Sequence, residues 1–197
     1  MFKRSCLVLA SLLLAGPALA TGSAAPAWIV GLCQSHEAQD KEDFLRQVAG
    51  VAAQWTERTG FETCGVLGRQ DDGRWSLVLS TNRSQVQCQF HDTLLLPNAL
   101  ATPDQLHTHP TAGPDGIIEV LPDTRAHARI VGDRGLDGVT HIRLPDPLRL
   151  SSTDLQVGGG YLAAGGRLFH QRSTDARTQD LGALPDVSNQ SVCQLKR

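Results

Sequence analysis

Two histidines placed two residues apart, His107 and His109, are well suited to bind one metal ion. Alternate side chains of a β-strand point to the same face, so both imidazoles could reach the same ion. Pro110 follows directly and favours a sharp end to that strand. A catalytic zinc ion takes three protein ligands and keeps one position open for water. A third ligand, a carboxylate or a histidine, must therefore come from elsewhere, together with a general base that is typically a glutamate.

Three short motifs resemble, in order along the chain, those of the JAMM (JAB/MPN+) family of zinc metalloproteases. They are Glu62-x-Cys64-Gly65-Val66-Leu67-Gly68, then His107-x-His109-Pro110, then Ser151-x-x-Asp154. The three together are far more specific than any one of them. The resemblance covers about residues 61–110 and 150–171, and it implies an exported bacterial member of the family.

The resemblance implies a role for each matched polar residue. His107, His109 and Asp154 would bind Zn²⁺ and leave one position for water. Glu62 would accept a proton from that water and later deliver it to the leaving amine. Ser151 would donate a hydrogen bond to the oxyanion of the tetrahedral intermediate. The implied activity is that of a metallopeptidase or isopeptidase that hydrolyses an amide bond in a peptide or protein substrate.

Each of these residues also has a purely structural interpretation. His107 and His109 could be solvated loop histidines, and Glu62 an ordinary charge at a strand edge. Ser151 could be a helix N-cap, and Asp154 a first-turn acid favoured by the helix dipole. Two other classes of function stay open on the same motifs. One is a non-catalytic binding module with the same fold, and the other is a secreted JAB-like toxin or effector.

The elements expected to carry these residues follow an α/β pattern of the α+β type. A helix is expected from Glu37 to Arg58, because apolar residues recur there at helical spacing and Gly60 can end it. A short helix should begin near Ser151. Strands or hairpins are expected at 61–68, 74–81, 85–90 and 161–171. The resemblance implies a JAMM/cytidine-deaminase-like mixed β-sheet flanked by helices.

The N-terminus is typical of a secretory signal peptide. Lys3 and Arg4 precede a short apolar run, and Ala18-Leu19-Ala20 has the small residues of a cleavage site. The run is too short to span a bilayer, so we expect a mature chain with no transmembrane segment, in the periplasm or secreted. The expected organisation is a signal peptide at 1–20, a lead-in segment at 21–36, a JAMM-like domain at 37–172 and a polar tail at 173–197.

The charge balance argues against nucleic acid as a partner. The 197 residues include 18 basic and 20 acidic side chains, a formal charge of −2. Loss of Lys3 and Arg4 with the signal peptide would make the mature chain more acidic still. Binding to phosphates needs a concentrated basic face, which this composition does not favour.

Four cysteines remain after the expected signal peptide, and in an exported protein they suggest two disulfides with three possible connectivities. We prefer Cys33 with Cys193, which would tie the two ends of the chain together, and Cys64 with Cys88, which would link neighbouring strands. The alternative is a buried free thiol at Cys64. No C-x-x-C spacing is present, so these cysteines are not expected to form a metal site.

The segment between the second and third motifs is much longer than the family pattern. Residues 111–150 form an irregular insertion beside the presumed site and could act as a lid, a substrate-selecting loop or a block. His127 and His141 within it are expected to be solvated loop residues, and Asp104 is expected to lie in a turn after Pro103. The expected signal peptide is a second departure from the family pattern. The best-known relatives cleave ubiquitin-like tails inside cells, where an exported protein would not act, so the substrate stays open.

Overall fold

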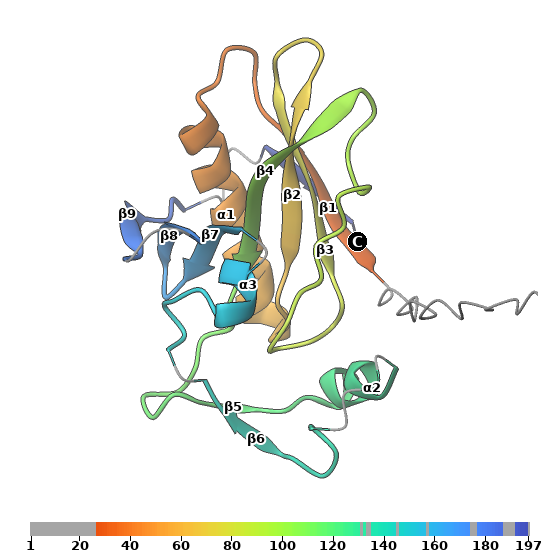
Figure 1. The fold of residues 1–197 in the computed structure, drawn as a ribbon, viewed down its shortest axis with the longest axis vertical. Helices are drawn as coiled ribbons and strands as arrows, with labels where there is room; N and C mark the ends of the chain where they lie inside the picture. Colours follow the sequence, from red (N-terminus) through yellow and green to blue (C-terminus); the bar gives the residue numbers. More distant parts are fainter. Residues whose placement is uncertain are drawn as a thin grey trace, which may run out of the picture.

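A mixed eight-stranded sheet forms the centre of the computed structural model (Figure 1). The structure describes residues 27–130, 132, 135–144, 146–156, 158–173, 177–186 and 192–196, and the expected signal peptide lies outside these residues. The elements in chain order are β1 (Trp28–Gln34), α1 (Lys41–Thr59), β2 (Cys64–Gln70), β3 (Trp75–Thr81), β4 (Ala99–Thr108), β5 (Ile117–Glu119), α2 (Pro122–Ile130), β6 (His141–Arg143), α3 (Ser152–Gln156), β7 (Gly159–Ala164), β8 (Arg167–Arg172), β9 (Gln179–Ala183) and β10 (Cys193–Leu195).

The order of strands in this sheet is β10-β1-β3-β2-β4-β7-β8-β9. β4 and β7 run parallel, and the other neighbouring pairs are antiparallel. The coarse prediction of a mixed α+β fold is confirmed by this large sheet and its few helices. Its likeness to JAMM or cytidine-deaminase folds stays a prediction.

Helix α1 covers one face of the sheet and forms the main core with it. Asp40 caps the N-terminus by accepting hydrogen bonds from the backbone N–H groups of Glu42 and Asp43, and Gly60 ends the helix in the left-handed region at φ 76°. The predicted helix is therefore confirmed, shifted by a few residues at its start. Its buried apolar residues pack against leucines of the sheet: Phe44, Leu45, Val48, Ala49, Val51 and Ala52 against Leu67, Leu77, Leu79, Leu106 and Leu168.

The opposite face of the sheet carries a smaller apolar cluster and the short helix α3. Leu162 of β7 and Phe169 of β8 pack there with Leu150, and Leu155 of α3 lies against them. Because side chains alternate along a strand, β4 sends Leu106 toward α1 and His107 toward this second face. The candidate site thus lies on the side of the sheet away from α1.

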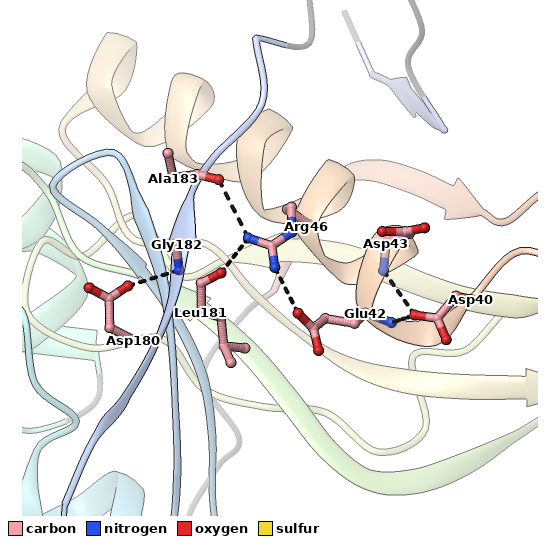
Figure 2. Close-up of polar contacts among 8 residues, drawn as sticks. All are labelled: Asp40, Glu42, Asp43, Arg46, Asp180, Leu181, Gly182 and Ala183. Atoms are coloured by element: carbon pink, nitrogen blue, oxygen red, sulfur yellow. Dashed lines mark hydrogen bonds and ion pairs between the residues drawn. The ribbon is translucent and has the colours of Figure 1, made fainter.

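Both ends of the described chain belong to the sheet, in contrast to the expected irregular lead-in and loose tail. Residues 28–34 form β1 between β10 and β3, and the tail supplies β9 and β10 as edge strands. Arg46 of α1 fastens β9, because its guanidinium donates to the carbonyl oxygens of Leu181 at 2.7 Å and Ala183 at 3.5 Å (Figure 2). A contact this distant in sequence leaves no local pattern in the polar tail.

The prediction of a strand at 85–90 was wrong, because this segment forms no strand in the structure. Side chains satisfy the backbone of this segment instead: Asn82 Oδ1 accepts from the N–H of Gln89 at 2.6 Å, and Ser84 Oγ accepts from the N–H of Val86 at 3.3 Å. Such local side-chain bonds compete with pairing in a sheet. The segment after β3 therefore crosses the second face of the sheet as a loop.

The insertion is more regular than its sequence indicated. β5 and β6 form a two-stranded antiparallel ribbon, and α2 lies between them in the chain. Figure 1 shows the ribbon and α2 below the lower ends of the central strands in that view. Its weak hydrophobic periodicity reflects elements of only three to nine residues.

Two disulfides join the cysteine pairs that the sequence favoured. Cys33 and Cys193 link β1 to β10, where they are partners in the strand register. Cys64 and Cys88 link the start of β2 to the loop after β3, and not to a neighbouring strand as expected. Disulfides of this kind are typical of proteins from oxidising compartments. Among the described residues, no helix is both long and apolar enough to cross a membrane.

Candidate metal centre

His107 and His109 lie at the end of β4 with their rings together. Their Nε2 atoms are 3.3 Å apart, and the ring centroids are 5.0 Å apart. His107 is buried and belongs to the strand, whereas His109 follows its last residue, Thr108. The strand periodicity inferred from the sequence thus brings both imidazoles to one face.

Thr108, between the two histidines, points to the opposite face and fixes the end of the strand. Its hydroxyl oxygen lies 2.6 Å from the hydroxyl of Thr56 on α1 and accepts a hydrogen bond from the backbone N–H of Thr63 at 2.9 Å. All three threonines are buried. A buried hydrogen-bonded network of this kind rigidifies the backbone that carries the histidine pair.

Asp154 comes to the histidines from α3. Its Oδ2 lies 3.6 Å from His107 Nε2, and one ligand atom from each of His107, His109 and Asp154 lies within 4.8 Å of the others. Ser151 and Asp154 hold each other at the start of the helix: the Ser151 N–H donates to Asp154 Oδ2 at 2.7 Å, and the Asp154 N–H donates to Ser151 Oγ at 3.2 Å. This reciprocal cap orients the carboxylate.

Ser151 lines a cavity together with His107, His109 and Asp154. Its Oγ accepts from the Asp154 N–H, so its own O–H remains able to donate to a ligand. The N-cap interpretation of Ser151 and the oxyanion role implied by the resemblance are therefore compatible.

Glu62 precedes β2 by two residues, whereas the sequence indicated a strand position. Its backbone is held on both sides, because its N–H donates to the carbonyl of Ser84 at 2.7 Å and its carbonyl accepts from Thr81 Oγ1 at 2.7 Å. The side chain is 5% exposed and lines the same cavity as the three candidate ligands. Burial and, less strongly, the charge of Asp154 raise the pKa of this carboxyl well above its usual range.

The two histidines are held in the neutral form that binds metals. Burial, and then the proximity of His109, lower the pKa of His107 to about 4, against the opposing charge of Asp154. Burial also lowers the pKa of His109, while the carbonyl of Pro147 and the acids Asp154 and Asp146 oppose the shift. A neutral imidazole keeps a lone pair available for an ion at neutral pH.

The cavity has a volume of about 850 Å³. Besides the residues already described, the loop after β3 forms much of its wall, with Phe90 packed edge-on against the His107 ring at a centroid distance of 5.9 Å. Cys88 also lines it, so the Cys64–Cys88 disulfide borders the site. The disulfide anchors this wall directly to the strand next to the histidines.

Two predictions about nearby polar residues were wrong. His127 is not a solvated loop residue, because it lies on α2, is 3% exposed and lines the cavity. Asp104 is not in a turn, because it belongs to β4 and pairs with Lys41 of α1 at 2.9 Å. His141 is exposed as predicted, although it lies in β6.

The sequence also missed Asn82, Gln85 and Gln105. Asn82 and Gln105 line the cavity, and Gln85 binds the insertion. A strand assignment for β4 that reached back from His107 would have placed Gln105 on the same face. No local signal marks the other two.

No protein-family model matches the chain, and neither a curated protein nor a solved structure matches it significantly. The family resemblance therefore stays a prediction that rests on the three motifs. The arrangement itself fits a metal ion: two imidazole nitrogens and one carboxylate oxygen converge, and a set of three such ligands is what a catalytic zinc site uses.

Proposed function

We propose that this protein is a zinc-dependent hydrolase of the JAMM type, a metallopeptidase or isopeptidase that cleaves an amide bond in a peptide or protein substrate. His107, His109 and Asp154 are its metal ligands. The observation that most supports the proposal is that a buried carboxyl group, Glu62, lines the same cavity as the three converging ligand atoms. A structural ion site needs no such buried acid beside it.

Zn²⁺ held by these three residues would supply a Lewis acid that polarises the substrate carbonyl and makes a water molecule more acidic. Glu62 accepts a proton from water and delivers it to the leaving amine. A pKa raised by burial and by Asp154 suits this work, because a raised pKa makes the carboxylate a stronger base toward water. Ser151 donates its hydroxyl hydrogen to the developing oxyanion.

The supporting residues keep these groups in place. The carbonyl of Pro147 orients the ring of His109, and the reciprocal cap with Ser151 orients Asp154. The two disulfides support action in an oxidising compartment, so we assign the mature protein to the periplasm or the exterior of the cell.

The test is cleavage of a mixture of N-acetylated, C-amidated peptides by the oxidised, zinc-loaded mature protein, with new termini detected by mass spectrometry. Glu62→Gln should reduce the rate by roughly 10²–10⁴-fold and leave bound zinc unchanged, because only proton transfer is removed. Glu57→Gln changes an exposed glutamate of α1 and is the matched control. Failure of the zinc-loaded protein to cleave any peptide, or full activity in Glu62→Gln, would overturn the proposal.

A further inference from the structure

Three residues that line the cavity each carry a buried polar atom with no hydrogen-bond partner among the described residues. These atoms are Nδ2 of Asn82, Oε1 of Gln105 and Nδ1 of His127. Native proteins leave few such atoms, because an unpaired polar group away from water is destabilising. Three residues with such atoms gather around one cavity, and this clustering suits a surface that binds a ligand.

The three groups approach the cavity from separate parts of the fold. Asn82 directly follows β3 and is 1% exposed, and its Oδ1 already accepts from the N–H of Gln89, which leaves Nδ2 as the free donor. Gln105 precedes His107 by two residues on β4 and so shares its face. His127 comes from α2 of the insertion.

Gln85 explains how the insertion brings His127 to the cavity. Its carboxamide oxygen accepts from the N–H of Leu121 at 2.7 Å and from Thr124 Oγ1 at 3.1 Å, and its Nε2 donates to the carbonyl of Glu119 at 2.7 Å. Gln85 is itself buried. These bonds fasten the start of α2 to the loop after β3, so the insertion forms a fixed part of the wall.

The chemistry of the wall indicates an uncharged ligand. Among the described residues that line the cavity there is no lysine or arginine, whereas Glu62, Asp92 and Asp154 are acidic, so these side chains disfavour a free carboxylate or a phosphate. A carboxamide N–H donor at Asn82 and a carboxamide oxygen acceptor at Gln105 together complement an amide group, which accepts at its oxygen and donates at its nitrogen. Burial also lowers the pKa of His127, which favours a neutral ring able to donate and accept.

We infer that Asn82, Gln105 and His127 form a substrate subsite that binds a backbone amide of an internal, uncharged stretch of peptide beside the His107–His109–Asp154 group. The inference rests on the proposed function for the reaction that follows binding. None of the three residues is a candidate metal ligand, so binding at the subsite and binding of zinc can be measured separately.

The experiment uses zinc-loaded Glu62→Gln protein, which should hold peptides without cleaving them. The protein is incubated with a mixture of N-acetylated, C-amidated hexapeptides and separated from free peptide by size exclusion. The peptides retained with the protein are measured by mass spectrometry. Adding His127→Phe or Gln105→Met should reduce retention roughly tenfold, because each removes hydrogen-bonding atoms at similar size. His141→Phe, in the exposed β6, is the matched control and should retain peptides fully.

His127→Phe and Gln105→Met break no described hydrogen bond, so loss of folding is not expected, and thermal unfolding of each variant checks it. Equal retention by these variants and the control would overturn the subsite, as would absence of retention by zinc-loaded protein. Zinc measured in every sample separates the two proposals. Retention that depends on His127 in a protein that holds no zinc would uphold the subsite and refute the metallopeptidase.

Discussion

His109 Nδ1 lies 2.9 Å from the carbonyl oxygen of Pro147. Because a carbonyl oxygen can only accept, the ring carries its hydrogen on Nδ1 and turns the lone pair of Nε2 toward His107 and Asp154. Pro147 belongs to the insertion, 38 residues further along the chain. The insertion therefore orients a candidate ligand as well as lining the cavity, which gives it a structural part in the site that a removable lid would not have.

Replacing Gln85 should loosen the insertion without unfolding the sheet. Gln85→Ala leaves the backbone N–H of Leu121 and the carbonyl of Glu119 without their partner, which costs roughly 2 kcal/mol of local stability. Hydrogen exchange of the amides at 121–130 should become faster, while the amides of β2 stay protected. Gln87→Ala, an exposed position on the same loop, is the control, and equal exchange in the two variants would contradict the prediction.

Glu62 should destabilise the metal-free protein at high pH. The pKa of Glu62 in the folded protein lies well above the ordinary 4.5, so folding favours the protonated carboxyl. The stability that this gives is fully present below pH 4.5 and is lost as the pH rises through the folded pKa, because the buried group must then ionise. Glu62→Gln cannot ionise. It should therefore raise the free energy of unfolding at pH 8 by roughly 1–3 kcal/mol, and by less at pH 4.5.

Urea unfolding of zinc-free protein at the two pH values measures this difference. Glu57→Gln, at an exposed position of α1, controls for a general effect of removing one acid. If Glu62→Gln and the wild type have the same stability at pH 8, the carboxyl is not held in a destabilising buried environment.

The two disulfides should have separable effects. Removing Cys33–Cys193, which are 160 residues apart, should cost about 5 kcal/mol of stability, and removing Cys64–Cys88, 24 apart, about 3 kcal/mol, since the longer loop restricts the unfolded chain more. Zinc affinity should fall more for the second pair, because Cys64 is the register partner of His107 and Cys88 lines the cavity.

Paired alanine variants, examined by urea unfolding and by zinc titration, test this ordering. A larger loss of zinc affinity on removing Cys33 and Cys193 would show that the disulfide beside the cavity does not support the site.

The sequence could predict the parts of the fold whose residues carry a local signal. The amphipathic period around Phe44 predicted α1, and the spacing of His107 and His109 predicted two imidazoles on one face. The Ser151-x-x-Asp154 pattern predicted the start of α3, where the structure adds a reciprocal cap between the two residues. In each case the residues that decide the structure are neighbours in the chain.

The remainder depends on contacts between distant segments. β9 has a polar sequence and is held by Arg46, some 135 residues earlier, and the fixed position of α2 depends on Gln85. His127 resembles an ordinary surface histidine of a polar helix until its neighbours are known. Composition and periodicity do not encode contacts between distant segments. The wall of the cavity could therefore not be predicted from the sequence, whereas the three candidate metal ligands could.

The metal content of the protein shows whether His107, His109 and Asp154 bind one zinc ion. Mature protein that is exposed to zinc and then desalted should hold about one ion per chain, and His107→Ala and Asp154→Ala should each hold far less, because a three-ligand site loses affinity when one ligand is removed. His141→Ala should match the wild type. A wild-type protein without zinc, or full zinc in both ligand variants, would show that these three residues do not form a zinc site.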